Sequence, residues 1–259
     1  MTTTPAHPRE LRDRIARGEW TTSTAGILDD YQQANLVVVP ESAAADFRAY
    51  CAANPEVCPL LAATDPGEPL LTYDDCTVDI RTALPRYRVW YDGVLVAEPG
   101  DILDHWRDDA VAFALGCSHT FDAPLRRIGV PVPRSAPPVY VTDRATTAAG
   151  MFGGPLVVSM RPVPESLVDA AAALTARYPT GHGAPVQIGN APGLGIADLS
   201  APDFGVFAGV PAGCLPVFWA CGVTPQLALP TLGLEYAITH CAGHMLVLDT
   251  VLDDTRSAP

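Results

Sequence analysis

Proline and glycine are the residues that most limit what this chain can fold into. The 259 residues include 26 prolines and 21 glycines, which together approach a fifth of the chain and are dispersed along it. Both residues mark turns and interrupt regular elements. About half of the residues are hydrophobic, at 48%, which is enough for a buried core in one large domain or two unequal ones. The sequence therefore predicts many turns around a well-buried core.

The charged residues exclude several classes of function. The net charge is −13, so a nucleic-acid partner is not expected, because such proteins carry basic patches that neutralise phosphates. All 16 basic residues are arginine. The absence of lysine excludes Schiff-base chemistry, including pyridoxal-phosphate anchoring, and a P-loop lysine.

The hydropathy pattern predicts a cytoplasmic protein with no membrane contact. No apolar run reaches the roughly 18–20 residues of a membrane span, and "MTTTPAHPRELRDRIARGEW" lacks the apolar core of a signal peptide. The seven cysteines form no C-x-x-C motif. We therefore expect reduced thiols, most of them buried.

Local patterns predict a mixed α/β fold. Helices are expected over residues 8–18, 41–54, 101–118 and 164–179. Apolar or alternating runs predict a hairpin over 77–99, with its turn at 91–93, and strands over 139–142, 154–163, 184–190 and 215–223. Both ends of the chain, 1–125 plus 200–259, are expected to build a larger layered domain. Residues 126–199 are expected to form a smaller, inserted two-layer α+β domain.

The segment "YAITHCAGHMLVLD" (236–249) contains two histidines, His240 and His244, at a spacing of four. On a helix they would share a face and could bind zinc. The flanking residues favour a strand covered on both faces, which would place the histidines roughly 13 Å apart, too far for one ion. A turn at Ala242-Gly243 would shorten that distance. We predict no metal, and a strand or strand-turn that delivers one or both histidines to a crevice.

Arginines are candidates for binding a substrate carboxylate. Arg81, Arg86 and Arg88 lie within "DIRTALPRYRVW", and a guanidinium binds a carboxylate through two parallel hydrogen bonds. The alternative is that these arginines form ion pairs with neighbouring acidic residues, namely Asp79, Asp92 or Glu98.

Three further stretches carry reactive or polar side chains. "VFWACGVTPQ" could present Cys221, Thr224 and Gln226 at the end of a strand. The alternative for Cys221, which the apolar strand favours, is a buried structural thiol. His182 lies in a glycine-rich loop. "LGCSHTFDAPL" (115–125), at the end of the helix expected over 101–118, places Ser118, His119 and Asp122 close together, but it contains no G-x-S-x-G motif of a serine hydrolase.

Several of these stretches together resemble a known family. The segments, in order, are "YQQANLVVVP", "NPEVCPLL", "DIRTALPRYRVW", "LGCSHTF", "GPLVVSMRP", "HGAPVQIG", "PDFG", "PVFWACGVTPQ" and "ITHCAGHMLVLD". They are similar to the hydro-lyase family that is also called the D-glutamate cyclase family, a DUF1445-type group, over about residues 10–250. The resemblance implies a three-layer α/β/α domain with a smaller two-layer α+β domain, a carbon–oxygen lyase activity that removes water, and no cofactor.

The chain departs from this family pattern at several polar positions. Ala83 replaces an aspartate, His119 an aromatic residue, Asp143 an asparagine, Gln187 a histidine and Val206 an aspartate, and Cys241-Ala242 replaces a small residue followed by proline. Changes of this kind alter proton transfer or substrate polarity. They favour a specialised member that acts on another acid, with ordinary divergence as the alternative.

We therefore expect a lyase that acts on a small carboxylic acid. His182, His240, His244 and Cys221 are the expected catalytic residues. Substrate contacts are expected from Arg81, Arg86, Arg88, Asn35, Ser118, His119, Thr224 and Gln226. Lactam closure and α,β-elimination would use the same groups, and a homodimer is left open. The alternatives are a metal-dependent enzyme that uses His240 and His244, and a carboxylate-binding protein without activity.

Overall fold

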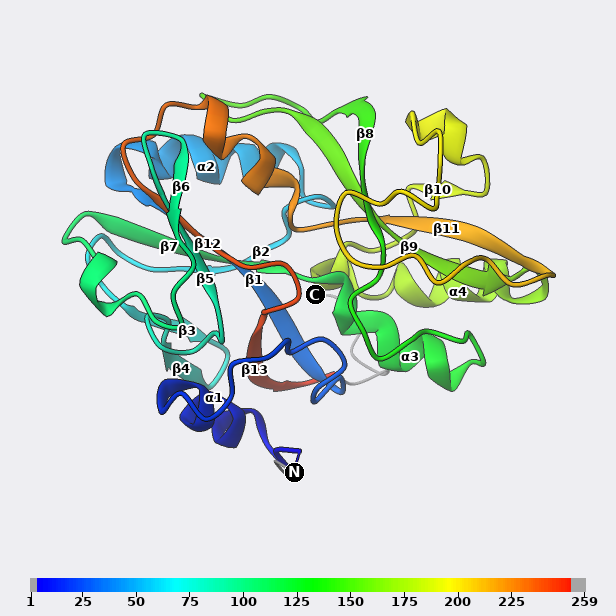
Figure 1. The fold of residues 1–259 in the computed structure, drawn as a ribbon, viewed down its shortest axis with the longest axis horizontal. Helices are drawn as coiled ribbons and strands as arrows, with labels where there is room; N and C mark the ends of the chain where they lie inside the picture. The colour runs from blue at the N-terminus through cyan, green and yellow to red at the C-terminus, as the bar shows by residue number, and fades with distance from the viewer. Residues whose placement is uncertain (1–3, 253–259) are drawn as a thin grey trace.

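The computed structural model describes residues 4–252, which form two large β-sheets and one small one (Figure 1). The seven-stranded sheet has the order β2-β7-β1-β12-β5-β6, and β13 also pairs with β1. Its strands are β1 (Tyr31–Pro40), β2 (Leu60–Ala63), β5 (Tyr87–Tyr91), β6 (Val94–Ala97), β7 (Ala110–Gly116), β12 (Ala237–His240) and β13 (Leu246–Val251). Every pairing in it is antiparallel.

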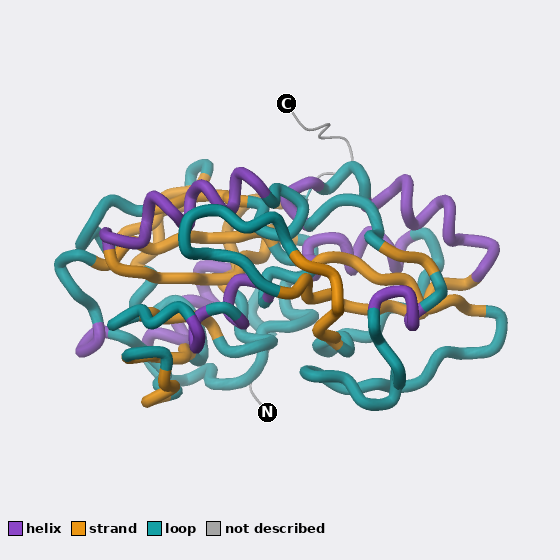
Figure 2. Tube along the Cα trace, turned by 90° about the horizontal axis from the view of Figure 1, so that it is seen from above, coloured by secondary structure: helices purple, strands orange, loops and turns teal. Residues whose placement is uncertain are grey.

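The four-stranded sheet lies beside the first and has the order β10-β11-β9-β8. Its strands are β8 (Val139–Ala145), β9 (Pro155–Pro164), β10 (Gln187–Ile188) and β11 (Cys214–Ala220). A separate hairpin joins β3 (Leu70–Tyr73) to β4 (Cys76–Asp79). The helices are α1 (Pro8–Ala16), α2 (Glu41–Ala53), α3 (Asp122–Arg127) and α4 (Val168–Thr175). Figure 2 shows strands through the middle of the molecule and helical segments along one side of both sheets.

Strand β1 is the centre of the seven-stranded sheet and is buried on both faces. Its side chains alternate between two cores: Leu36 and Val38 face the β3–β4 side, whereas Val37 and Val39 face helix α2. A strand covered on both faces needs apolar residues at both parities. The run "NLVVVP" meets this requirement.

Helix α2 begins directly after β1 and covers one face of this sheet. Pro40 precedes its first residue, Glu41, which places a carboxylate in the first turn. Phe47 projects from the helix into the core, where its ring lies 4.8 Å from that of Phe113 and 5.0 Å from that of Phe152. These edge-to-face contacts attach the helix to β7 and to the loop before β9.

The four-stranded sheet is also covered on both faces. Val163, Val217 and Trp219 pack with residues of α3 and α4 and of the segments beside them on one face. The other face packs Val158 and Phe218 against the segment around Leu194. In β9, Ser159 and Arg161 therefore share the helix-covered face with Val163, because side chains alternate along a strand.

Most of the predicted elements are confirmed, and so is the mixed α/β class. The hairpin turn at 91–93 joins β5 to β6 through Asp92 and Gly93, both with positive φ, as a tight Asp-Gly turn requires. The expected strands at 139–142, 154–163 and 215–223 correspond to β8, β9 and β11, and the strand at 184–190 shortens to β10. The three-layer arrangement and the inserted domain at 126–199 stay predictions.

The prediction of a helix over 101–118 is wrong. A short 3-10 turn at Leu103–His105 precedes strand β7, and every residue of β7 is buried. The run "AVAFALG" is apolar at every position, and periodicity cannot distinguish a strand covered on both faces from a buried helix. In the segment 236–249, a turn at Ala242-Gly243 divides β12 from β13. The strand-turn alternative is therefore the one that the structure has, and a single continuous strand is not formed.

No helix within residues 4–252 combines the length and the apolar character that crossing a bilayer requires.

We predict that Phe47→Ala lowers the free energy of unfolding by about 3–5 kcal/mol, because the fully buried ring would leave a cavity between α2 and the sheet. Urea denaturation measures this change. Val206→Ala, at a side chain that is 74% exposed, should change the free energy by less than about 0.5 kcal/mol. Equal effects of the two substitutions would contradict the proposed packing role.

Candidate active site

The candidate site begins where two strands leave a gap beside β1. On one edge, β1 pairs with β12 at Val37 and Val38 and with β13 at Gln33 and Ala34. The turn between β12 and β13 therefore leaves Asn35 and Leu36 without a strand partner on that edge. The ring of His240 takes this place, because its Nδ1 accepts a hydrogen bond of 3.2 Å from the Leu36 N–H.

A small cavity of about 40 Å³ lies at this gap, between the two large sheets. Its polar lining consists of Asn35, Ser118, His119, Ser159 and His240, together with the thiols of Cys117 and Cys221. The rest of the wall comes from the apolar side chains of Val139, Val223 and Met245 and from three loop segments, namely Ala136-Pro137, Phe204-Gly205 and Ala242-Gly243. This volume holds about one water molecule, so a larger ligand requires the loop residues to move apart.

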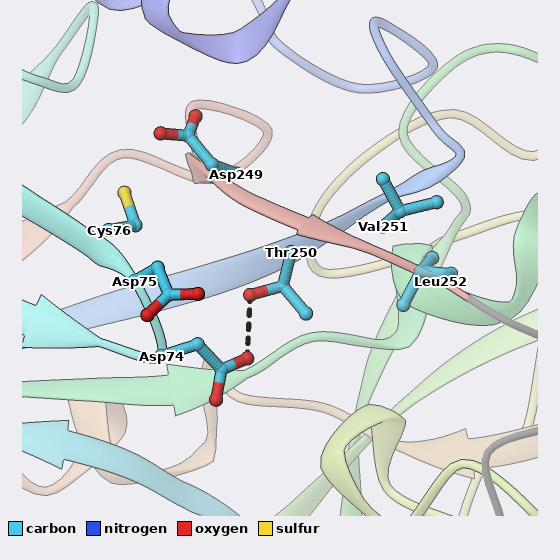
Figure 3. Close-up of a pocket in the computed structure, with 7 residues that line it drawn as sticks. All are labelled: Asp74, Asp75, Cys76, Asp249, Thr250, Val251 and Leu252. Atoms are coloured by element: carbon cyan, nitrogen blue, oxygen red, sulfur yellow. Dashed lines mark hydrogen bonds between the residues drawn. The ribbon is translucent and has the colours of Figure 1, made fainter.

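A second, larger hollow is open and acidic (Figure 3). It measures about 670 Å³ and is lined by Asp74, Asp75, Cys76 and Asp249–Leu252. The Thr250 hydroxyl donates a 2.8 Å hydrogen bond to Asp74. Three carboxylates would repel an acidic substrate, so the smaller cavity is the better candidate for the family of reactions expected from the sequence.

A buried arginine, Arg161, organises the wall of the smaller cavity. Its side chain is 1% exposed, and its Nε donates to Asp122 Oδ1 at 2.8 Å. The terminal nitrogens donate to two serines, Nη1 to Ser159 Oγ at 2.7 Å and Nη2 to Ser118 Oγ at 3.1 Å. The guanidinium also lies 5.0 Å from the ring centre of Phe121. Paired and hydrogen-bonded in this way, a charge can remain buried.

His119 is oriented by the same carboxylate. Its Nδ1 lies 2.8 Å from Asp122 Oδ2. Burial by itself would raise the pKa of Asp122, but the Arg161 charge and the His119 hydrogen bond outweigh burial and hold the pKa below its ordinary value. An ionised carboxylate only accepts hydrogen bonds. Nδ1 of His119 therefore carries a proton, so in the neutral ring the lone pair is on Nε2, in a side chain that lines the cavity.

His240 has the opposite hydrogen-bond pattern. Its Nδ1 lies 3.0 Å from Gln226 Nε2, in addition to the Leu36 N–H, while the Leu36 carbonyl is more distant at 3.4 Å. A backbone N–H can only donate, so Nδ1 accepts and Nε2 carries the proton. Burial lowers the pKa of His240 to about 4, which keeps the ring neutral near pH 7.

The other two predicted histidines do not line this cavity. His182 is buried at a positive φ of 78°, and its Nδ1 contacts the Glu56 carbonyl at 2.8 Å. Its Nε2 is buried without a hydrogen-bond partner among the described residues. Burial lowers the pKa of His182 to about 4. His244 is half-buried in the turn after β12, and its Nδ1 contacts the Ala242 carbonyl at 3.0 Å.

The three predicted arginines also lie outside the cavity lining. Arg81 makes two hydrogen bonds to Asp79, and Arg88 makes one to Glu98. Arg86 is exposed, and its carbonyl accepts from the Cys241 N–H. The ion-pair interpretation accounts for the positions of Arg81 and Arg88, and a role for any of the three in substrate binding stays a prediction.

Of the three residues predicted to form a site after β11, only Cys221 lines the cavity, whereas Thr224 and Gln226 do not. Cys221 lines the cavity, and burial raises the pKa of its thiol, so the thiolate is disfavoured. Thr224 Oγ1 is used by the backbone, because it accepts from the Val157 N–H and donates to the Cys221 carbonyl. The side-chain amide of Gln226 contacts His240 Nδ1 at 3.0 Å, so Gln226 is connected to the cavity through that histidine.

Three residues of the site, Asp122, Ser159 and Arg161, were not among the expected site residues. A signal for two of them is present in "PLVVSMRPV", where a serine and an arginine share one face of an otherwise apolar strand. A buried arginine requires a partner. The sequence does not show which carboxylate that partner is.

A candidate metal centre is not found in the part of the chain that the structure describes. Within residues 4–252, no group of three or more His, Cys, Asp or Glu side chains is arranged to hold a metal ion.

Comparisons with known proteins agree with the family resemblance. A family profile described as D-glutamate cyclase matches residues 111–249, which include every cavity-lining side chain named above except Asn35. A protein named "Putative hydro-lyase" from Rubrobacter xylanophilus is 50% identical over 245 residues, covering 93% of this chain and 94% of the relative. A relative of the same description from Bordetella pertussis is 48% identical over 239 residues, 90% of this chain and 86% of the relative. Another from Rhodococcus opacus is 48% identical over 250 residues, with 95% of each chain covered.

We predict that Asp122→Asn lowers the free energy of unfolding by about 3–5 kcal/mol, because it leaves the charge of Arg161 buried without its counter-ion. Asp109→Asn is the matched control, since Asp109 pairs with Arg107 at the surface and such pairs contribute about 0–1 kcal/mol. Guanidinium denaturation at pH 7 compares the two variants. A loss below about 1 kcal/mol for Asp122→Asn would show that the pair is not what holds Arg161 in place.

The buried histidines predict a pH-dependent stability. The pKa values of His182 and His240 lie near 4 in the folded chain, below their ordinary value of 6.5. Between pH 6.5 and 4 the unfolded chain therefore binds more protons, and the free energy of unfolding falls as the pH falls, by up to about 3 kcal/mol per histidine. Above pH 6.5 this contribution is fully present.

His182→Asn tests this pH dependence, because asparagine tolerates the positive φ at this position. Urea denaturation between pH 7 and 5 should give a shallower slope for the variant, by up to about 1.4 kcal/mol per pH unit for one proton. An unchanged slope would mean that His182 is protonated equally in both states.

Proposed function

This chain belongs to the D-glutamate cyclase family of hydro-lyases, and we propose that it eliminates water from a small amino or hydroxy carboxylic acid. One observation carries the proposal. Two histidines line the same cavity, and their Nδ1 atoms are held by partners of opposite kind, a carboxylate for His119 and a backbone N–H for His240. The pair therefore offers one free base and one N–H donor to a bound molecule.

His119 is the proposed general base. Asp122 fixes its tautomer and stabilises the imidazolium that forms when Nε2 takes a proton. The carboxylate is itself held by Arg161, so the ring orientation is set before the substrate arrives. In this chain the base occupies a position at which the resemblance implies an aromatic residue, which supports a specialised member of the family.

His240 is the proposed hydrogen-bond donor. Its ring is neutral near pH 7, since its pKa is about 4, and its Nε2–H can stabilise negative charge on a reacting oxygen. A preorganised donor in a site that excludes water contributes about 10²- to 10³-fold to kcat. His240 would therefore hold the oxygen that becomes the oxyanion, while His119 moves protons.

The proton balance fits either form of water loss. In lactam closure, two protons leave the substrate ammonium, the nitrogen bonds to the carboxyl carbon, and the carbon–oxygen bond breaks to release water. His119 would carry those protons in turn to the departing oxygen. In α,β-elimination, His119 would take one proton from Cα and the departing hydroxyl would receive one.

Mass spectrometry tests the function directly. Purified protein is incubated with D-glutamate, L-glutamate and a panel of amino and hydroxy acids, and each mixture is analysed for loss of one water. Product from D-glutamate supports lactam closure, and product from another acid supports the specialised lyase. No water loss from any acid of the panel contradicts the proposal.

We predict that His119→Asn lowers kcat by about 10²- to 10⁴-fold on the substrate that this screen identifies, because the general base is lost. His105→Asn, on the 3-10 turn before β7 and outside the cavity lining, should retain the activity of the unchanged chain. Circular dichroism establishes that both variants fold. Full turnover by the His119 variant would reject this residue as the base.

A further inference from the structure

Ser118 and Ser159 carry a hydroxyl arrangement that the proton chemistry above does not use. Each Oγ accepts a hydrogen bond from a terminal nitrogen of Arg161, and the two hydroxyl oxygens lie 3.2 Å apart. Both side chains are buried, and both line the cavity.

The two serines have a hydroxyl hydrogen available for a ligand. Two hydroxyl hydrogens are available, but only one of them can lie between the two oxygens. Within residues 4–252, no carbonyl or carboxylate accepts from either hydroxyl. At least one O–H is therefore directed elsewhere, and the cavity is the space that both serines share.

The positive charge of Arg161 determines the electrostatic potential at these hydroxyls. Asp122 binds the guanidinium at Nε, whereas the serines bind its terminal nitrogens. The rings of Phe121 and Trp219, with centres 5.0 and 5.7 Å from the guanidinium carbon, exclude water from its faces. In such a low-dielectric setting the charge is poorly screened. The serine side of the wall is therefore electropositive, and the His119 side, next to Asp122, is not.

We propose that Ser118 and Ser159, polarised by Arg161, form the subsite that binds the carboxylate of the substrate. This inference rests on the proposed function and adds the orientation of the substrate. Ser118, Ser159 and His119 line the same small cavity, so a carboxylate bound to the serines would leave the adjacent atom of the molecule near His119. The substrate class is an acid with a removable proton next to the carboxylate, namely an α-amino or α-hydroxy acid.

A carboxylate fits this subsite better than a larger anion. The ion pair of Arg161 and Asp122 has no net charge, so the subsite can polarise a monoanion but cannot neutralise a dianion. The cavity of about 40 Å³ also limits the size of what binds without movement of the loops. We therefore expect formate and acetate to bind and inorganic phosphate not to bind.

The first test uses the unchanged protein and small probes. Nuclear magnetic resonance titrations with ¹³C-formate and ¹³C-acetate are compared with formamide and acetamide, which have the same shape without the charge. Binding of the anions at least about tenfold tighter than the amides supports the subsite. Equal binding of acid and amide, or tighter binding of inorganic phosphate, overturns it.

The second test removes the hydroxyls. Ser118→Ala, Ser159→Ala and the double variant should weaken formate binding, the double variant by at least about tenfold, which corresponds to about 1.4 kcal/mol. Ser200→Ala is the matched control, because Ser200 is exposed and its hydroxyl donates to Asp198. Unchanged formate affinity in a folded double variant overturns the proposal. If the double variant does not fold, the comparison of formate with formamide on the unchanged protein decides.

Turnover separates this inference from the proposed function. With a substrate in hand, the serine variants should raise KM by about tenfold or more while His119→Asn lowers kcat. A subsite that binds formate in a protein without water-eliminating activity would leave the subsite standing and reject the lyase proposal. Turnover with an unchanged KM in the double variant would support the lyase proposal and reject the carboxylate subsite.

Discussion

The ion pair between Arg161 and Asp122 is the interaction on which the candidate site depends. Arg161 comes from β9 of the four-stranded sheet, and Asp122 begins α3, a few residues after β7 of the seven-stranded sheet. A buried guanidinium without a carboxylate would be strongly unfavourable, so the pair fixes how these two segments meet. The same carboxylate orients His119 and the same guanidinium holds Ser118 and Ser159. One requirement of folding thus places the proposed base and the proposed carboxylate subsite side by side.

The division between β12 and β13 has a comparable effect on the other side of the cavity. A central strand such as β1 normally satisfies its backbone groups through its neighbours. At Leu36 the neighbour is interrupted, and His240 supplies the missing acceptor. The interruption opens space for a ligand, and the hydrogen bond that repairs it fixes the tautomer of the histidine. Nδ1 of His240 therefore satisfies the backbone N–H of Leu36, while Nε2 is left for the proposed role as a hydrogen-bond donor.

The sequence predicted parts of this site that depend on short-range patterns. Ser118 with His119, and Cys221 with Gln226, each lie close together in the sequence, and the fold brings both groups to His240 or its cavity. The sequence could not assign Arg161 to Asp122, because 39 residues separate them and any of many carboxylates could have been the partner. The helix expected over 101–118 fails for a related reason: the all-apolar run of β7 becomes a strand only because segments on both faces cover it. Both the partner of Arg161 and the strand conformation of β7 depend on contacts between residues far apart in the sequence, which a local sequence pattern does not encode.

The two parts of the cavity wall differ in how firmly the fold fixes them. His119, Ser159 and His240 are attached to strands or to the turn beside α3, and each is fixed by a hydrogen bond that the fold requires. Apart from Val139 of β8, most of the remaining wall is made of loop residues. These approach one another closely, because a side chain at Gly205 would collide with the Pro137 carbonyl. Phe204 is tied to the four-stranded sheet, because it forms an isolated β-bridge with Val139 of β8. The other two loop segments, Ala136-Pro137 and Ala242-Gly243, lie outside the strands of both large sheets. Moving Ala136-Pro137 and Ala242-Gly243 apart would admit a larger ligand without breaking the hydrogen bonds that hold the Arg161–Asp122 pair and the two histidines. A preorganised site requires this separation between the parts that move and the parts that stay fixed.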